Sequence, residues 1–401
     1  MRAVKWTIVL LVLALFAVSC AEEKSATEQP AVEAIASPAG AGAAEPFLFA
    51  TRDSVLLSWL EPVAGTDRTA LRFARYRAGR WSESRTIVER NDLFVNWADF
   101  PSIVEDAKGT LFAHWLQKSG KGAYAYDVRM VTSRDGGASW GESFLLNRDG
   151  KEAEHGFATL AVLPEGGVAA TWLDGRKMTG GGDMGIRYAT VDADGTIAND
   201  VELDDRTCEC CTTGMTMTSN GPVIVYRDRS AEEVRDIAYV TKTASGWTKP
   251  ARVSADDWKI NACPVNGPQA DAIGQRVVTA WFTAAREKGR ASVAFSDDGG
   301  VTFAKPVQID DGKPIGRLDV LLLDESTALV TWLEQTSAGG EIRTRRVGRD
   351  GNKGPSMKIA DSSTARAAGF SRTARLGRDV YFTWTEQSAE SKRVHVARGR
   401  F

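Results

Sequence analysis

The sequence has few histidines and nearly equal numbers of basic and acidic residues, and each of these two features excludes a class of function. Lys and Arg number 50 in 401 residues, Asp and Glu number 52, and the formal net charge is −2. This balance provides no basic field for a nucleic-acid backbone, so we expect no nucleic-acid partner. The three histidines, His114, His155 and His395, lack the spacing of a metal site, and we expect His155 to lie on the surface.

A long apolar run is also absent, because the N-terminal one is too short to span a membrane comfortably. Arg2 and Lys5 precede it, residues 6–18 are apolar except for Thr7, and Cys20 follows. A short basic region, an apolar core and small residues are typical of a secretory signal peptide, which we assign to residues 1–19.

The four residues that end this segment, Ala17-Val18-Ser19-Cys20, resemble a bacterial lipobox. The resemblance implies that Cys20 is acylated and becomes the mature N-terminus, so the membrane is a partner through a lipid anchor. Ala21 follows the cysteine, which favours the outer membrane. The alternative is an ordinary signal peptide cleaved nearby. In both cases the protein is exported.

Bulky apolar residues are scarce in the segment that follows. Residues 21–45 are rich in Ala, Glu, Pro, Gly and Ser. Such a segment buries too little surface to offset its ordering entropy. We therefore expect residues 20–45 to be a lipidated cysteine with a flexible tether, and residues 46–401 to be the folded domain.

No convincing amphipathic helix follows residue 45, and short β-type runs recur in its place. An aromatic residue ends an apolar run at intervals of 51 to 57 residues. These positions are Trp59, Trp115, Trp172, Tyr226, Trp281, Trp332 and Trp384. A four-strand unit repeated at this period predicts an all-β fold, a β-propeller of seven blades, with six as the alternative. The last unit shows only three strands, and propellers commonly complete such a blade with a strand from the other terminus.

Two turns carry a sharper motif of the form S-x-D-x-G-x-S/T-W. Its residues are Ser133, Asp135, Gly137 and Trp140 in one copy, and Ser296, Asp298, Gly300 and Phe303 in the other. The motif resembles the Asp box, or BNR repeat, of the sialidase superfamily. The resemblance implies a structural role, in which the aspartate accepts backbone hydrogen bonds and glycine supplies a positive φ.

In this fold the loops opposite the Asp-box turns are long and charged, and we expect them to form a ligand-binding funnel. The candidate ligand-binding residues are Arg176, Arg227, Arg229, Arg235, Asp236, Trp258, Arg317 and Arg372. Guanidinium groups suit a glycan carboxylate or another small anionic ligand. The alternative for Arg227 to Arg229 with Arg235 and Asp236 is an ion-pair network that braces one loop.

Catalysis by this funnel is less well supported by the sequence. Sialidases carry R-I-P in the first blade, and the nearest segment here is Asp99-Phe100-Pro101-Ser102. Tyr226 occupies the structural aromatic position, which makes it a poor nucleophile. We therefore expect binding without turnover. The alternative is a sialidase-type glycoside hydrolase, with Asp174 and Asp228 as catalytic carboxylates.

Four cysteines remain in the folded domain, and they form a separate hypothesis. Cys208, Cys210 and Cys211 open the fourth unit, and Cys263 opens the fifth. Because the starts of adjacent blades lie side by side, we expect Cys263 within disulfide distance of the cluster. The alternatives are a redox-active dithiol and a thiolate site for Cu or Zn. Apart from such a metal, no cofactor is expected.

Overall fold

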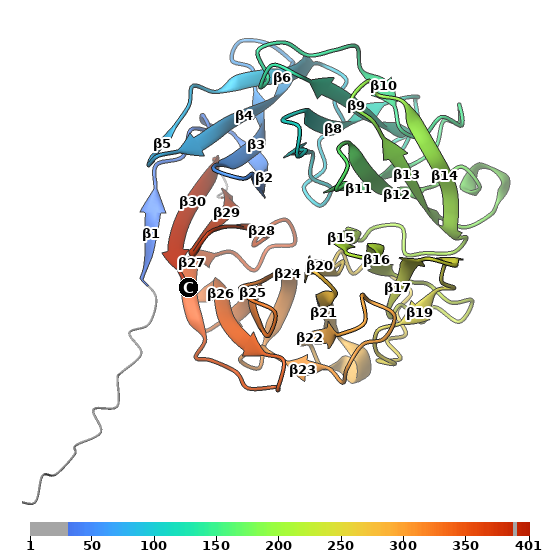
Figure 1. The fold of residues 1–401 in the computed structure, drawn as a ribbon, viewed down its shortest axis with the longest axis vertical. Coiled ribbons are helices and arrows are strands. Elements are labelled where there is room, and N and C mark those ends of the chain that lie inside the picture. The colour runs from blue at the N-terminus through green and yellow to red at the C-terminus, as the bar shows by residue number, and fades with distance from the viewer. Residues whose placement is uncertain (1–30, 388–390) are drawn as a thin grey trace, which may run out of the picture.

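The structure is a computed structural model that describes residues 31–387 and 391–401, and it is a ring of seven antiparallel sheets (Figure 1). The sheets follow one another along the chain, as the seven-blade prediction requires, and the six-blade alternative is wrong. The strands of the first four blades are β2 (Ala44–Ala50), β3 (Val55–Pro62), β4 (Thr69–Arg77), β5 (Arg80–Trp81) and β6 (Arg85–Arg90); β7 (Ser102–Glu105), β8 (Leu111–Lys118), β9 (Tyr126–Ser133) and β10 (Phe144–Leu145); β11 (His155–Val162), β12 (Val168–Asp174), β13 (Gly185–Val191) and β14 (Ile197–Asp204); β15 (Gly214–Thr218), β16 (Gly221–Arg227), β17 (Ile237–Thr243), β18 (Gly246–Trp247) and β19 (Ala251–Arg252).

The remaining blades repeat the same order, and the last one closes the ring. Their strands are β20 (Gln269–Ile273), β21 (Arg276–Thr283), β22 (Arg290–Ser296) and β23 (Val307–Gln308); β24 (Pro314–Leu322), β25 (Thr327–Thr336), β26 (Gly339–Gly348) and β27 (Met357–Ser362); β28 (Ser371–Leu376), β29 (Asp379–Gln387) and β30 (Lys392–Arg400), with β1 (Val32–Ile35). Strand β1 pairs antiparallel with β30 as the fourth strand of the last blade.

This closure moves the start of the folded domain into the segment that we expected to be a flexible tether. Residues 32–35 form a strand, and β2 begins at Ala44, so the domain starts before residue 46. The N-terminal strand supplies the edge that the three-stranded last unit lacks, and Glu33 forms an ion pair with Arg398 across it. Cys20 and the signal peptide lie outside the described residues.

The repeated aromatic residues are the centres of the blade packing. Trp59, Trp172, Trp281 and Trp332 are all less than 2 % exposed. In several blades the indole N–H donates to a carboxylate two residues further along the same strand, as from Trp172 to Asp174 at 2.8 Å and from Trp332 to Glu334 at 2.7 Å. Residues two apart share a strand face, so the repeated pair satisfies a buried donor without interrupting the sheet.

Each Asp box is a self-contained turn between the third and fourth strands. The Asp135 carboxylate accepts from the Ser139 N–H at 2.9 Å, and Ser133 Oγ accepts from the Gly137 N–H at 2.9 Å. Gly137 has φ +84, and a Cβ there would lie 2.4 Å from Phe73 of the preceding blade. Glycine is therefore required both by the backbone and by the blade contact.

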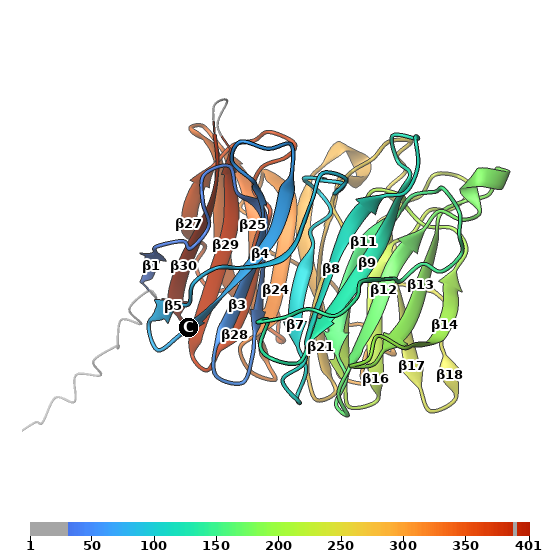
Figure 2. The same cartoon turned by 90° about the horizontal axis from the view of Figure 1, so that it is seen from above.

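Helix is nearly absent from the described part of the chain. Two short 3-10 turns, η1 (Met178–Gly180) and η2 (Ala285–Glu287), are the helical elements there. None of the described helices has the length and hydrophobicity needed to cross a membrane. Figure 2 shows these turns on one side of the ring and the β17–β18 hairpin on the other, which separates a loop face from an Asp-box face.

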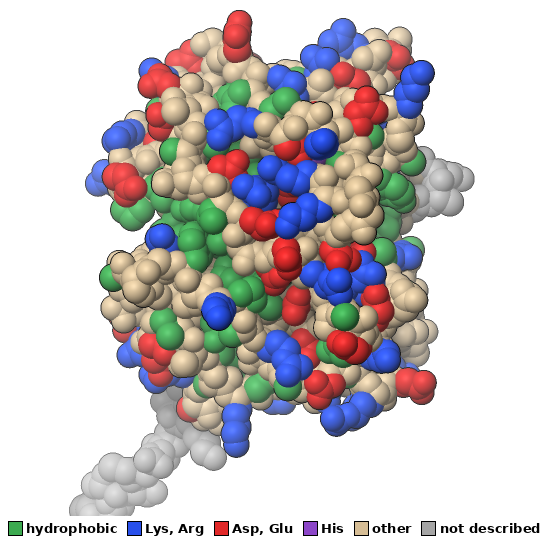
Figure 3. Space-filling view, turned by 90° about the vertical axis from the view of Figure 1, so that its right-hand side faces the viewer, with side chains coloured by type: hydrophobic (Ala, Val, Ile, Leu, Met, Phe, Trp, Pro, Cys, Tyr) green, Lys and Arg blue, Asp and Glu red, His purple; other side chains and the backbone are tan. Residues whose placement is uncertain are grey.

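The outer surface shows no field of one sign on the face drawn in Figure 3. Lys and Arg side chains alternate there with Asp and Glu side chains. This agrees with the near-zero net charge, and any electrostatic recognition must depend on local groups.

Candidate functional site

Two neighbouring cavities lie between the innermost strands, along the axis of the ring. The larger has a volume of about 360 Å³ and includes Ala50, Ile273 and Arg375, which stand next to the turns that end the first strands. It therefore occupies the half of the channel nearer the Asp-box face. The smaller, about 40 Å³, lies toward the loop face. Phe47, Thr159, Leu160, Gln269 and Arg372 line both cavities.

Arg372 stands at the junction of these cavities without a protein acceptor. The residue is only 8 % exposed, and its guanidinium carbon lies 5.1 Å from the centroid of the Phe100 ring. Within the described ranges, its side chain forms no hydrogen bond and no ion pair. Burial lowers the pKa of Arg372, and the charge of Asp319 opposes this effect. A buried cation with free donors that faces a cavity is suited to bind an anion.

The other predicted arginines donate most of their N–H groups to protein acceptors, although the buried Nε of Arg317 has no hydrogen-bond partner in the described part of the chain. Arg227 Nη2 donates to the carbonyl oxygens of Asn266 at 2.6 Å and Phe282 at 2.8 Å. Its Nη1 donates to the carbonyl oxygen of Arg235 at 2.6 Å, and its guanidinium lies 4.8 Å from the ring centroid of Trp258, which is itself buried. These contacts hold Arg227 as a brace between two blades.

Arg317 is braced in the same way. Its Nη1 donates to the Val265 carbonyl at 2.5 Å, and its Nη2 to the Arg366 carbonyl at 2.6 Å. The guanidinium lies over Phe370, 4.3 Å from its centroid, and burial lowers the pKa of Arg317 to about 10. On the loop face, the centre of the predicted funnel is thus occupied by packed arginine and aromatic side chains.

Arg229 and Arg235 form the ion-pair network that was the alternative to ligand binding. Both pair with Glu233, at 2.7 and 2.8 Å, and both pair with Glu209. Asp236 is the last residue of the same loop, and its carboxylate accepts a hydrogen bond from the Trp258 N–H at 3.0 Å. The network therefore braces the loop between β16 and β17.

The two candidate catalytic aspartates have separate surroundings. Asp174 ends β12, and hydrogen bonds from Arg176 together with the charge of His155 lower its pKa although burial opposes them. Asp228 follows β16, and burial raises its pKa to about 6. They belong to different blades and share none of the contacts described for this part of the chain.

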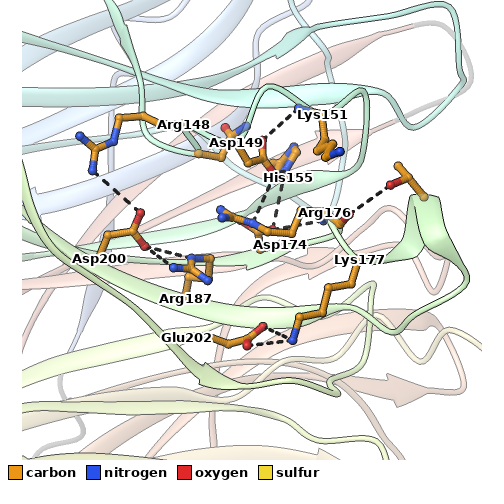
Figure 4. Close-up of polar contacts among 12 residues, drawn as sticks. Arg148, Asp149, Lys151, His155, Asp174, Arg176, Lys177, Arg187, Asp200 and Glu202 are labelled. Atoms are coloured by element: carbon orange, nitrogen blue, oxygen red, sulfur yellow. Dashed lines mark hydrogen bonds and ion pairs between the residues drawn. The ribbon is translucent and has the colours of Figure 1, made fainter.

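His155 is fully buried, so its expected surface position is wrong. Its Nε2 lies 3.0 Å from Asp149 Oδ2 and 3.8 Å from Asp174 Oδ1 (Figure 4). Arg176 Nε lies 2.6 Å from Asp174 and 3.3 Å from Asp149. The guanidinium thus supplies the positive charge that a metal ion would supply to these two carboxylates.

A group that the sequence did not reveal lies beside the smaller cavity. Asp99 Oδ2 accepts from the Phe157 N–H at 2.5 Å, and burial raises the pKa of Asp99 to about 7. Nearby, Tyr126 donates to Glu154 at 2.9 Å. Burial raises the pKa of Glu154 to about 6 and raises that of Tyr126 above its ordinary value. A tyrosine whose anion is disfavoured in this way is poorly suited to nucleophilic attack.

Three of the four cysteines are brought together and the fourth is not. Cys208 Sγ lies 3.7 Å from Cys210 Sγ and 3.6 Å from Cys211 Sγ. Hydrogen bonds from the other two thiols lower the pKa of Cys208 well below its usual range. Cys263 is exposed and outside the group, and all four are free thiols. The predicted disulfide to Cys263 is therefore wrong. The two loops do touch, since a Cβ on Gly267 would lie 1.9 Å from the Thr212 carbonyl oxygen, but the Cys263 side chain is exposed and lies outside the thiol group.

Comparison with known families agrees with the repeat and with the Asp boxes. The family model described as "BNR repeat-like domain" matches residues 64–339. The chain belongs to this family. A search of curated proteins found no match.

Solved structures similar to this BNR-repeat protein are propellers of diverse activity. A polysaccharide lyase, titled as an ulvan lyase of family PL25, has a TM-score of 0.60 at 10 % identity and covers 90 % of this chain and 95 % of its own. A GH93 α-L-arabinofuranosidase of Fusarium graminearum has a TM-score of 0.50 at 12 % identity, covering 90 % and 93 %. The Hadza microbial sialidase Hz136 has a TM-score of 0.47 at 13 % identity, covering 83 % and 74 %. At such identities the likeness shows the fold alone.

Proposed function

We propose that this BNR-repeat propeller is an exported, lipid-anchored binding protein that holds a small acidic sugar in its axial channel, without turnover. The observation that carries the proposal is Arg372. Among the arginines selected from the sequence, it alone combines deep burial, a cavity and donors that no described protein group accepts.

The larger cavity has the size and lining that such a ligand needs. A volume of about 360 Å³ falls in the range of small-molecule pockets. Phe47, Leu160 and Met215 supply apolar surface for a sugar ring, and Gln269 supplies an amide. The ligand carboxylate would accept a bidentate pair of hydrogen bonds from Arg372. The fold likeness to carbohydrate-active propellers is compatible with this ligand class.

The carboxyl groups around the channel should make the affinity for an anionic ligand depend on pH. Burial raises the pKa of Asp271 to about 6 and that of Asp99 to about 7. As the pH falls from 8 to 5 these groups take up protons, and repulsion of an anionic ligand decreases. We therefore expect the affinity for an acidic sugar to increase as the pH falls from 8 to 5, and the affinity for a neutral sugar to stay unchanged.

The test is equilibrium binding to the full chain, purified in detergent. Glucuronate and N-acetylneuraminate serve as acidic probes, and glucose is the neutral control. Arg372→Gln should weaken binding of an acidic probe by about 10- to 100-fold, as the loss of a charged hydrogen bond implies. Arg400→Gln is the matched control, because Arg400 is highly exposed and pairs with Asp379 outside the channel.

Equal affinity in wild type and Arg372→Gln, or equal binding of glucose, would refute the proposal. A fluorogenic sialoside and a panel of aryl glycosides test the claim that there is no turnover. Hydrolysis that is lost in Asp174→Asn or Asp228→Asn would establish the hydrolase alternative instead.

A further inference from the structure

The turn that carries Cys208, Cys210 and Cys211 is a feature that the axial channel does not explain. It lies in the connection between β14 and β15, where one blade passes to the next. Cys208 is 1 % exposed and Cys211 is 2 % exposed, and Cys210 packs against the apolar cluster that contains Phe100 and Phe157. Three thiols thus converge in a largely dry place.

The sulfur positions match a metal coordination sphere. The two shorter sulfur–sulfur distances are 3.6 and 3.7 Å, and all three sulfurs lie within 4.8 Å of one another. Bonds of about 2.3 Å, as in zinc thiolates, place sulfur ligands about 3.8–4.0 Å apart in tetrahedral or trigonal geometry. The triad therefore needs only a small adjustment to hold one ion.

A nearly buried cation stands beside the triad and favours thiolates. Arg235 is 3 % exposed, and its Nη1 donates to Cys208 Sγ at 3.2 Å. The same guanidinium is fixed by Glu209 at 3.1 Å and by Glu233 at 2.8 Å. This is the arrangement of an outer partner that orients a ligand atom and balances its charge.

We propose that Cys208, Cys210 and Cys211 form a three-coordinate site for Cu(I). Thiolates select soft ions, and Cu(I) is the soft ion that three thiolates suit. Structural zinc requires four ligands, and within the described residues no fourth His, Cys, Asp or Glu atom joins the triad. On binding, the ion forms three Cu–S bonds, the remaining thiol protons pass to solvent, and copper stays at oxidation state +1.

The experiment is an anaerobic titration of the reduced full chain with Cu(I), buffered by a competing chelator of known affinity. We expect one tightly held ion per chain and an X-ray absorption spectrum with three sulfur neighbours. Cys208→Ser, Cys210→Ser and Cys211→Ser should each abolish stoichiometric binding. Cys263→Ser is the matched control and should bind as wild type does, because that thiol is exposed and outside the triad.

Arg235→Lys supplies a second measurement that keeps the copper stoichiometry intact. Loss of the fixed guanidinium should lower the Cu(I) affinity by about 10- to 100-fold, the usual effect of an outer partner. Circular dichroism and thermal unfolding of every variant would confirm that the propeller is intact. The proposal is overturned if the reduced wild type takes up no Cu(I), if Cys263→Ser also abolishes binding, or if Zn(II) binds with four protein ligands. A disulfide within the triad that persists under the reducing conditions of the titration and excludes Cu(I) would overturn it too.

Discussion

Arg372 and Arg227 are both buried arginines, yet substitution by glutamine should destabilise the protein strongly at Arg227 and hardly at all at Arg372. Arg227 is 1 % exposed and donates to carbonyl oxygens of three residues, whereas Arg372 is 8 % exposed and has no described acceptor. The same substitution removes the same charge and a similar volume from both sites. The difference between the two variants therefore isolates the hydrogen bonds.

The expected magnitudes follow from these contacts. Removing Arg227 leaves the buried carbonyl groups of three residues without their charged donor, and each buried acceptor left unsatisfied costs about 1–3 kcal/mol of unfolding free energy. Removing Arg372 loses only its stacking on Phe100, worth about 1–2 kcal/mol, and relieves the desolvation of an unpaired cation. We expect Arg372→Gln to change the unfolding free energy by less than about 1 kcal/mol.

Chemical denaturation of wild type and both variants at pH 7 measures this difference. The midpoint should fall clearly for Arg227→Gln and stay near the wild-type value for Arg372→Gln, with similar slopes for all three. A loss in Arg372→Gln as large as that in Arg227→Gln would refute the reasoning. Arg372 would then be a structural brace, and its free donors would carry no argument for a ligand.

Three further changes test other parts of the structure. Asp99→Asn should flatten the fall in unfolding free energy between pH 4 and pH 7, as measured by denaturation at several pH values. The reason is that the buried Asp99 carboxyl stabilises the fold fully only while it is protonated, and its ionisation costs about 4 kcal/mol by pH 7. An unchanged slope in the variant would contradict the raised pKa of Asp99. Gly137→Ala should lower the unfolding free energy by about 2–4 kcal/mol, because the added methyl group clashes with Phe73 and the residue must keep a positive φ. Gly136→Ala is the control: it has φ +70 and open space around it, and should cost only about 1 kcal/mol. Equal losses in the two variants would contradict the blade contact at Gly137. Cys20→Ala should release the protein from the membrane fraction, and unchanged fractionation would count against the lipid anchor.

The fold was predictable because its signals are local in sequence and repeat. The aromatic period identifies seven units, and each Asp box fixes its turn through residues four apart, as between Asp135 and Ser139. A strand from the other terminus was anticipated for the last blade, but its position at Val32–Ile35 was missed, because these residues pair with β30 across almost the whole chain. A short strand with exposed glutamate and alanine has no period of its own to detect.

The candidate site was less predictable, because charge pairing depends on tertiary structure. The sequence selected eight residues of suitable chemistry, but it did not indicate that Arg317 donates to the carbonyl of Val265 while Arg372 meets only a ring and a cavity. The burial of His155 was missed for the same reason, since its partner Asp174 belongs to the next strand. Groupings within one loop were easier to foresee, as with the three neighbouring cysteines and the ion-pair loop of Arg229 and Arg235.

The cysteine turn and the axial channel share a wall, and this links the two proposed sites. Thr212 and Thr213 directly follow Cys211 and line the smaller cavity with Arg372. The Phe100 ring stacks against the Arg372 guanidinium, and Phe100 belongs to the apolar cluster against which Cys210 packs. An ion that fixes the cysteine turn also fixes this wall, so Cu(I) and the acidic sugar must change each other's affinity by the same factor if they are coupled at all. Binding of glucuronate to the metal-free and Cu(I)-loaded chain measures that factor. Equal affinities would show that the two sites act independently, although they are neighbours in the fold.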